Sequence, residues 1–269
     1  MPETRIFPSL DRISILAAAI LLAFTLAVFI DFPTQEINLQ LPGIFLDFQI
    51  SVQTIIALLV AGLTATGADW LIRGHPKFRG KNSIQHWFLP ALTSWAIGVV
   101  LFKQPFGPVW WAVFGIGTTT LMIVLIAEYL VVDIEDTQQY PAMIGIIAVS
   151  HALFLILTIT IRASDARLFL SIPTITLAFI LASLRTIFLR LRTWAFGPIA
   201  IAAIIIAQIG AALHYLPIRP VTYGLALLGP AYALTSFTGG LLEKRRFRQM
   251  IIEPAIVLII VWGIALIIQ

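Results

Sequence analysis

The sequence predicts an all-α integral membrane protein, a polytopic bundle of about nine transmembrane helices that forms a single domain over residues 1–269. Hydrophobic residues make up 59% of the chain and charged residues 11%, whereas about 25% of residues in soluble domains are charged. Apolar runs of about 18 residues or more recur along the whole sequence, and each is long enough to cross a bilayer as a helix. The connections between them leave no room for a separate soluble domain.

The apolar runs define the predicted spans in order. The first run follows Arg5 and Arg12 and has no small-residue cleavage site, so we interpret it as a retained helix and not as a signal peptide. The longest connection, 31–49, contains apolar residues and a Pro-Gly pair, and we expect it to lie along the membrane interface. The predicted spans are 13–30, 50–71, 84–102, 109–132, 142–161, 168–189, 195–214, 221–241 and 251–268.

The distribution of basic residues predicts a cytoplasmic N-terminus and an external C-terminus. In this orientation thirteen of the 17 Lys and Arg residues lie on the cytoplasmic side and four on the outer side. Cytoplasmic loops of membrane proteins carry an excess of Lys and Arg. A missed or additional span would mix the two groups, so the split also supports nine spans.

An acidic segment, EYLVVDIEDTQQYP, follows the fourth run and would face the cytoplasm. Carboxylates suit hard cations, so Asp133, Glu135 and Asp136 are weak candidates for holding a magnesium ion. Enzymes that act on lipid diphosphates typically carry two such motifs, and this chain has one. We therefore predict no metal site and no cofactor.

Motifs for other chemistries are missing from the sequence. The chain has no Cys, which excludes disulfides, thiolate zinc sites and a cysteine nucleophile. It also has no GxxxxGK[ST] phosphate loop, no HExxH and no GxSxG. The basic residues lie in short loops, so we predict no nucleic-acid partner.

Four ionisable residues at the cytoplasmic ends of different spans are the first candidate site. Asp69, His86, Glu128 and Arg185 would share one level of the membrane. Alanines at four-residue spacing in 57–65 share a helical face with Asp69 and indicate that this face packs inside the bundle. The four residues are candidates for a cytoplasmic-side pocket, and ion pairing or hydration at the interface is the simpler explanation of the same residues.

His151 is the one ionisable residue predicted near the middle of the membrane. Gln208 in the seventh span is a candidate polar partner, but no spacing links the two residues. A neutral imidazole that is hydrogen-bonded inside the bundle, a proton relay and a cofactor ligand all stay open.

The most basic loop, IRGHPKFRGKN, is a candidate site for anionic lipid headgroups. Basic clusters next to a span attract the anionic cytoplasmic leaflet. The positive-inside signal alone, or docking of a soluble partner, would account for the same residues. The candidate headgroup-binding residues are Arg73, Lys77, Arg79 and Lys81.

The segments TATGADWLIRGHP, HWFLPALTSWAIG and AEYLVVD together resemble a family of bacterial multi-pass membrane proteins that has no assigned activity. The resemblance extends over much of the chain. It implies a helical membrane fold and a location in the bacterial inner (plasma) membrane. It implies no catalytic residues.

Three functions stay open. The favoured one is a non-enzymatic membrane component that binds lipid or a protein partner, which includes further copies of the chain. The second is a carrier of a small solute or of protons. The third is a metal-dependent enzyme that acts on a lipid-linked phosphate at the cytoplasmic interface. Enzymatic activity is thus undecided, with a non-enzymatic role favoured.

Overall fold

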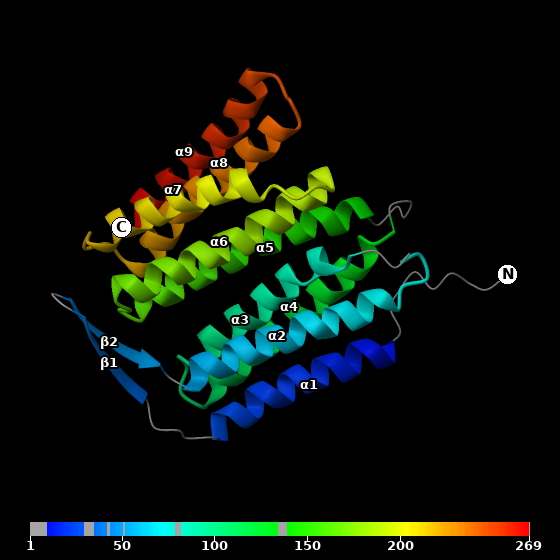
Figure 1. Cartoon of the computed structure of the whole chain (residues 1–269), viewed down its shortest axis with the longest axis vertical. Helices are drawn as coiled ribbons and strands as arrows, with labels where there is room; N and C mark the ends of the chain where they lie inside the picture. The colour runs from blue at the N-terminus through cyan, green and yellow to red at the C-terminus, as the bar shows by residue number, and fades with distance from the viewer. Residues whose placement is uncertain are drawn as a thin grey trace. The chain divides into compact units, whose positions relative to one another are not determined.

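The computed structural model describes residues 10–29, 35–41, 44–50, 52–78, 82–133 and 139–268. The chain divides into two compact units, Met1–Asp133 and Ile134–Gln269 (Figure 1). The single domain expected from the sequence stays a prediction.

The described residues of the first unit form helices and a β-hairpin. Its elements are α1 (Leu10–Phe29), β1 (Gln35–Leu41), β2 (Ile44–Ile50), α2 (Val52–Arg73), the 3₁₀ turn η1 (Ile84–His86), α3 (Phe88–Leu101) and α4 (Pro108–Leu130). The two strands are antiparallel, and their register places Ile37 opposite Phe48 and Leu39 opposite Leu46. The hairpin occupies the connection that we expected to lie along the interface.

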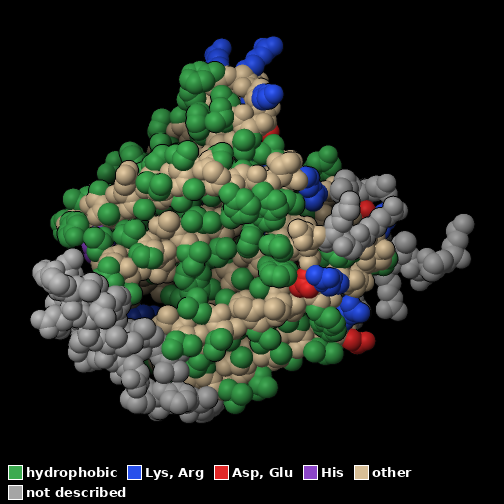
Figure 2. Space-filling model, in the orientation of Figure 1, with side chains coloured by type: hydrophobic (Ala, Val, Ile, Leu, Met, Phe, Trp, Pro, Cys, Tyr) green, Lys and Arg blue, Asp and Glu red, His purple; other side chains and the backbone are tan. Residues whose placement is uncertain are grey.

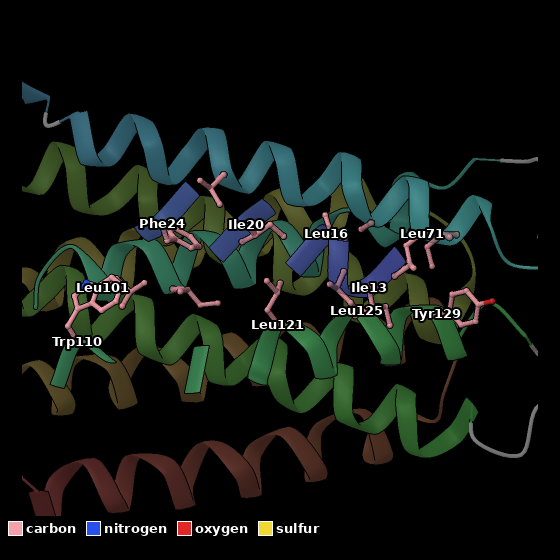
Figure 3. Packing of buried hydrophobic residues seen from close by; sticks show 14 residues of the cluster. Ile13, Leu16, Ile20, Phe24, Leu71, Leu101, Trp110, Leu121, Leu125 and Tyr129 are labelled. Carbon is pink, nitrogen blue, oxygen red and sulfur yellow. The ribbon is translucent and has the colours of Figure 1, made fainter. Parts of the chain in front are cut away.

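The core of the first unit forms around one face of α1. Ile13, Leu16, Ile20 and Phe24 are buried and recur every three or four residues, which is the spacing of one helical face (Figure 3). They pack with residues of α2, α3 and α4, among them Leu71, Leu101, Leu121 and Leu125. Other apolar residues of α1, such as Ile15 and Leu22, are exposed, as expected for a helix that contacts lipid.

The described residues of the second unit, 139–268, form five helices and their connections. The helices are α5 (Gln139–Ala163), α6 (Leu168–Leu191), α7 (Phe196–His214), α8 (Pro220–Leu242) and α9 (Phe247–Ile268). The hydroxyl of Tyr223 in α8 donates to the carbonyl of Gly210 in α7 at 3.1 Å. Trp262 of α9 donates from Nε1 to the carbonyl of Ala226 in α8, also at 3.1 Å. These bonds attach α8 to its two neighbours in sequence.

The prediction of an all-α, polytopic membrane bundle is confirmed. In the described residues, eight helices are long and apolar enough to cross a membrane, namely α2 to α9 with η1 extending α3. Hydrophobic side chains are spread over the visible surface (Figure 2). The helix bounds follow the predicted spans closely, and the largest shift is at α9, which begins at Phe247 instead of residue 251. The orientation of the bundle, and α1 as a ninth span, stay predictions.

Hydroxyl side chains within the helices mostly bond to their own backbone. Thr64 donates to the carbonyl of Val60 at 2.7 Å, and Ser150 donates to that of Ile146 at the same distance. Such bonds satisfy the hydroxyl inside its own helix, where no water is present. The same bond to the residue four positions earlier is made by Thr25, Thr93, Thr118, Thr119, Thr120, Thr158, Thr160, Thr174, Thr186 and Thr235.

Candidate functional site

A buried imidazole–carboxylate pair lies at one end of the first unit. Nδ1 of His86 is 2.7 Å from Oε2 of Glu128, and the two side chains are 4% and 1% exposed. The turn η1 positions the histidine just before α3, and the last turn of α4 positions the glutamate. A buried carboxylate is expensive unless it is paired and hydrogen-bonded, so this contact satisfies an otherwise costly group.

Asp69, near the end of α2, accepts three side-chain hydrogen bonds. Arg73 donates from Nε at 2.6 Å, Trp87 donates from Nε1 at 3.2 Å, and the Ser83 hydroxyl donates to the same oxygen as Trp87. The bonds from Ser83 and Trp87 attach the end of α2 to the segment that enters α3. Asp69 therefore lies next to the His86 turn, and its contacts join α2 to the segment before α3.

Lys77 forms an ion pair with an acidic residue. Its Nζ lies 2.9 Å from Oδ1 and 2.8 Å from Oδ2 of Asp133. Beside it, the ring of His75 lies 4.4 Å from that of Tyr129. The loop after α2 is thus fastened to the end of α4 at two points. Asp133 contacts a lysine here, and Arg79, Lys81, Glu135 and Asp136 lie outside the described residues.

The structure brings together part of the predicted cytoplasmic-side pocket. His86 and Glu128 touch, and Asp69 lies beside them through Trp87. Arg185 belongs to α6 of the second unit, where its side chain is fully buried. The pocket that would unite all four residues stays a prediction.

The second unit contains a polar cavity of about 310 Å³. Four helical segments and the loop between α8 and α9 contribute to its wall, so residues far apart in sequence converge there. Its lining contains both cations and an anion, which is unusual for a space within a membrane bundle. The lining residues are Ile147, His151, Thr186, Arg190, Tyr232, Thr235, Ser236, Arg245 and Glu253.

Two arginines of this cavity share one carboxylate. Arg190 binds Glu243 with a two-pronged contact, from Nε at 2.9 Å and from Nη2 at 3.0 Å. Arg245 reaches the same carboxylate from Nε at 2.5 Å. A Cβ atom at Gly239 would lie 2.7 Å from Nη1 of Arg190, so the glycine makes room for the guanidinium against α8. The single carboxylate of Glu243 thus pairs with two guanidinium groups.

Glu253, on α9, is the carboxylate that lines the cavity. Tyr232 of α8 donates its phenolic hydrogen to Oε1 of Glu253 at 3.1 Å. In the part of the chain that the structure describes, the ion pairs include no cation bound to Glu253 within 4 Å. The cavity therefore has a positive side at the arginines and a negative side at α9.

His151 lies midway along α5 and also lines the cavity. Its Nδ1 is 2.9 Å from the carbonyl oxygen of Ile147. A carbonyl only accepts hydrogen bonds, so Nδ1 carries the hydrogen, and Nε2 of the neutral ring remains an acceptor. The ring meets that of Tyr232 edge to face at 5.4 Å. Gln208, its predicted partner, is exposed on α7.

An apolar groove of about 700 Å³ continues from the cavity along α9. It shares Arg245 and Glu253 with the cavity, and its other lining residues recur at three- or four-residue spacing on one face of α9. Those residues are Gln249, Ile252, Ile256 and Val257. The combined site is polar at one end and apolar at the other.

A family model described as "Protein of unknown function (DUF5656)" matches residues 32–268. The chain belongs to this family. The membership agrees with the resemblance of the sequence to an uncharacterised family. Comparison of this DUF5656 protein with curated proteins and with solved structures gives no match.

The polar cavity of this DUF5656 protein was not predicted from the sequence, apart from His151. Arg190, Glu243 and Arg245 lie at helix ends, where charges are ordinary. One signal was available, because Glu253 is a carboxylate inside the predicted span 251–268 and such residues are functional candidates. No group of three or more His, Cys, Asp or Glu that could hold a metal occurs within the described ranges.

Proposed function

We propose that this DUF5656 protein is a non-enzymatic, lipid-binding component of the bacterial plasma membrane. The observation that carries the proposal is the continuity of the polar cavity with the apolar groove on α9 through Arg245 and Glu253. A phospholipid has the same division, with a polar headgroup at one end and hydrocarbon chains at the other.

The groove offers what an acyl chain needs. Ile252, Ile256 and Val257 present branched aliphatic side chains on one face of α9. Close packing against them would supply dispersion contacts and fix the chain in position. The headgroup would then lie among hydrogen-bonding and charged groups, which replace the water that it loses.

The expected orientation assigns this site to the cytoplasmic leaflet. With the N-terminus in the cytoplasm, the ends of α6 and α8 lie on the cytoplasmic side, and Arg190 and Glu243 are at those ends. The basic loop after α2 would add a general attraction to anionic lipids on the same side. Of its described cations, Lys77 is already bound to Asp133, so we assign the loop a supporting role.

The test is native mass spectrometry of the full chain, purified in mild detergent. We expect the wild type to retain lipid and Arg245→Ala to retain much less. Arg248→Ala is the matched control, because Arg248 is a nearby exposed arginine, in the first turn of α9, that lines neither the cavity nor the groove. A wild-type chain without lipid, or equal retention by the two variants, would contradict the proposal.

A second candidate function, a carrier of protons or a small solute, is favoured by the position of His151. This residue lies midway along α5 with an acceptor nitrogen and lines a cavity that extends to the loop residue Arg245. The carrier hypothesis expects flux in proteoliposomes that is lost in His151→Ala, with normal insertion of the variant. Undiminished flux in His151→Ala would remove this residue from any transport step.

A further inference from the structure

The charges of the cavity are arranged in two separate groups. On one side, Glu243 binds both Arg190 and Arg245, which leaves one positive charge in excess. Nε of Arg245 is used in this contact, and the Nη atoms of a guanidinium are further donors. This side therefore suits a singly charged anion with several acceptor oxygens, such as a phosphodiester.

On the other side, Glu253 contributes one negative charge. Its Oε1 accepts a hydrogen bond from Tyr232 at 3.1 Å, and a carboxylate has further lone pairs for other donors. Arg245 and Glu253 line both the cavity and the groove, yet they are not within ion-pair distance of each other in the described contacts. A ligand that fits between Arg245 and Glu253, with one charge of each sign, would neutralise both residues.

We infer that the site selects a zwitterionic headgroup of the phosphoethanolamine type, with its phosphate at Arg245 and its primary ammonium at Glu253. The inference rests on the proposed lipid-binding function and specifies its ligand. The phosphate neutralises the excess charge of the arginine pair, and the ammonium neutralises Glu253. The acyl chains leave the phosphate end along Ile252 and Ile256.

Other common headgroups satisfy this arrangement less well. A phosphoglycerol headgroup has the phosphate but no cation, so Glu253 would lose water without gaining a charged partner. A phosphocholine headgroup has a cation, but its quaternary nitrogen has no hydrogen to donate to the carboxylate. The primary ammonium has three hydrogens to donate.

The experiment uses the purified, delipidated full chain with an equimolar mixture of phosphatidylethanolamine, phosphatidylcholine and phosphatidylglycerol of identical acyl chains. Native mass spectrometry then gives the relative adduct populations. We expect the ethanolamine lipid to be preferred by about three- to tenfold, the range for a hydrogen-bonded charge at a partly exposed site. Glu253→Gln should lose this preference and shift towards phosphatidylglycerol, whereas Arg248→Gln should keep it.

A series of ligands provides a test that requires no variant. Mono- and dimethylation of the headgroup amine remove donor hydrogens one at a time, and we expect binding to fall at each step towards choline. Absence of any lipid adduct would contradict the proposed function itself. Lipid binding with equal or better retention of phosphatidylcholine or phosphatidylglycerol would leave that function intact and overturn the headgroup assignment, as would unchanged selectivity in a folded Glu253→Gln variant.

Discussion

Nδ1 of His86 lies 2.7 Å from Oε2 of Glu128, and both side chains are almost completely buried. The contact joins the turn that precedes α3 to the last helical turn of α4. The two residues are 42 positions apart in sequence. They lie near the contacts that the loop after α2 makes with the end of α4. The pair thus fixes one end of the first unit.

Removal of either partner should destabilise the protein. We expect His86→Gln to lower the free energy of unfolding by roughly 3–5 kcal/mol, because the Glu128 carboxylate stays buried without its imidazole partner. Glu128→Gln should cost less, because the amide oxygen can still accept a hydrogen bond from the imidazole. The double variant should cost less than the sum of the two single losses. Unfolding in mixed detergent micelles measures these values, and strictly additive losses would contradict the coupling.

Disruption of the hydroxyl pair between α6 and α8 should lower the free energy of unfolding by a smaller amount. Thr235 donates to the carbonyl of Ala231 at 2.8 Å, so Ser183 must donate in its 2.8 Å contact with Thr235 Oγ1. Thr235→Val removes this acceptor and should cost about 1 kcal/mol. Thr235→Ser keeps the acceptor and should cost less. Equal losses in the two variants would show that the hydrogen bond contributes nothing.

The glycine on α8 that faces α5 should not tolerate a side chain. A Cβ atom at Gly224 would lie 2.5 Å from Cγ1 of Ile159 and 3.0 Å from Cδ1 of Leu155. Gly224→Ala should therefore force α5 and α8 apart and cost about 1–3 kcal/mol. Gly263→Ala and Gly145→Ala are controls within the same unit, because nothing lies within 4 Å of either new Cβ atom. Thermal unfolding of the three variants should give the lowest midpoint temperature for Gly224→Ala.

The predicted orientation is directly testable because the chain contains no cysteine. Single cysteines replace exposed residues of the loops. With an impermeant maleimide added to intact cells, or to spheroplasts where an outer membrane is present, Lys103→Cys and Arg219→Cys should react. Arg246→Cys should react only after the plasma membrane is permeabilised. The opposite pattern would reverse the assignment of the two sides, and labelling of all three at once would contradict the alternation of spans.

The helices were predictable because the length of an apolar run determines whether it spans a bilayer, and this signal is local. The proximity of His86 to Glu128 could also be predicted, because alternating spans bring the end of one helix near the start of another. The contacts of Asp69 with Ser83 and Trp87 follow from the same alternation. These residues lie in spans that are neighbours in sequence.

The hairpin was missed although alternation of apolar and polar residues is present in 36–41 and 46–50. Strands of seven residues give a weak periodic signal next to twenty-residue apolar runs. The cavity of the second unit was missed for a different reason. Arg190, Glu243 and Arg245 are ordinary charges at helix ends, and their convergence with Glu253 depends on tertiary packing of α6, α8 and α9.

The hydroxyl groups that bond to carbonyls of their own helices have a consequence for experiments on this family. Threonine and serine carry much of the polarity of these helices, but a hydroxyl that already donates its hydrogen to the backbone can only accept from a solute. Such a bond moves with its helix, so it is insensitive to what occupies the spaces between helices. A search for ligands can therefore concentrate on the few groups that can still form hydrogen bonds or ion pairs with a solute. The first of these are the imidazole of His151 and the carboxylate of Glu253.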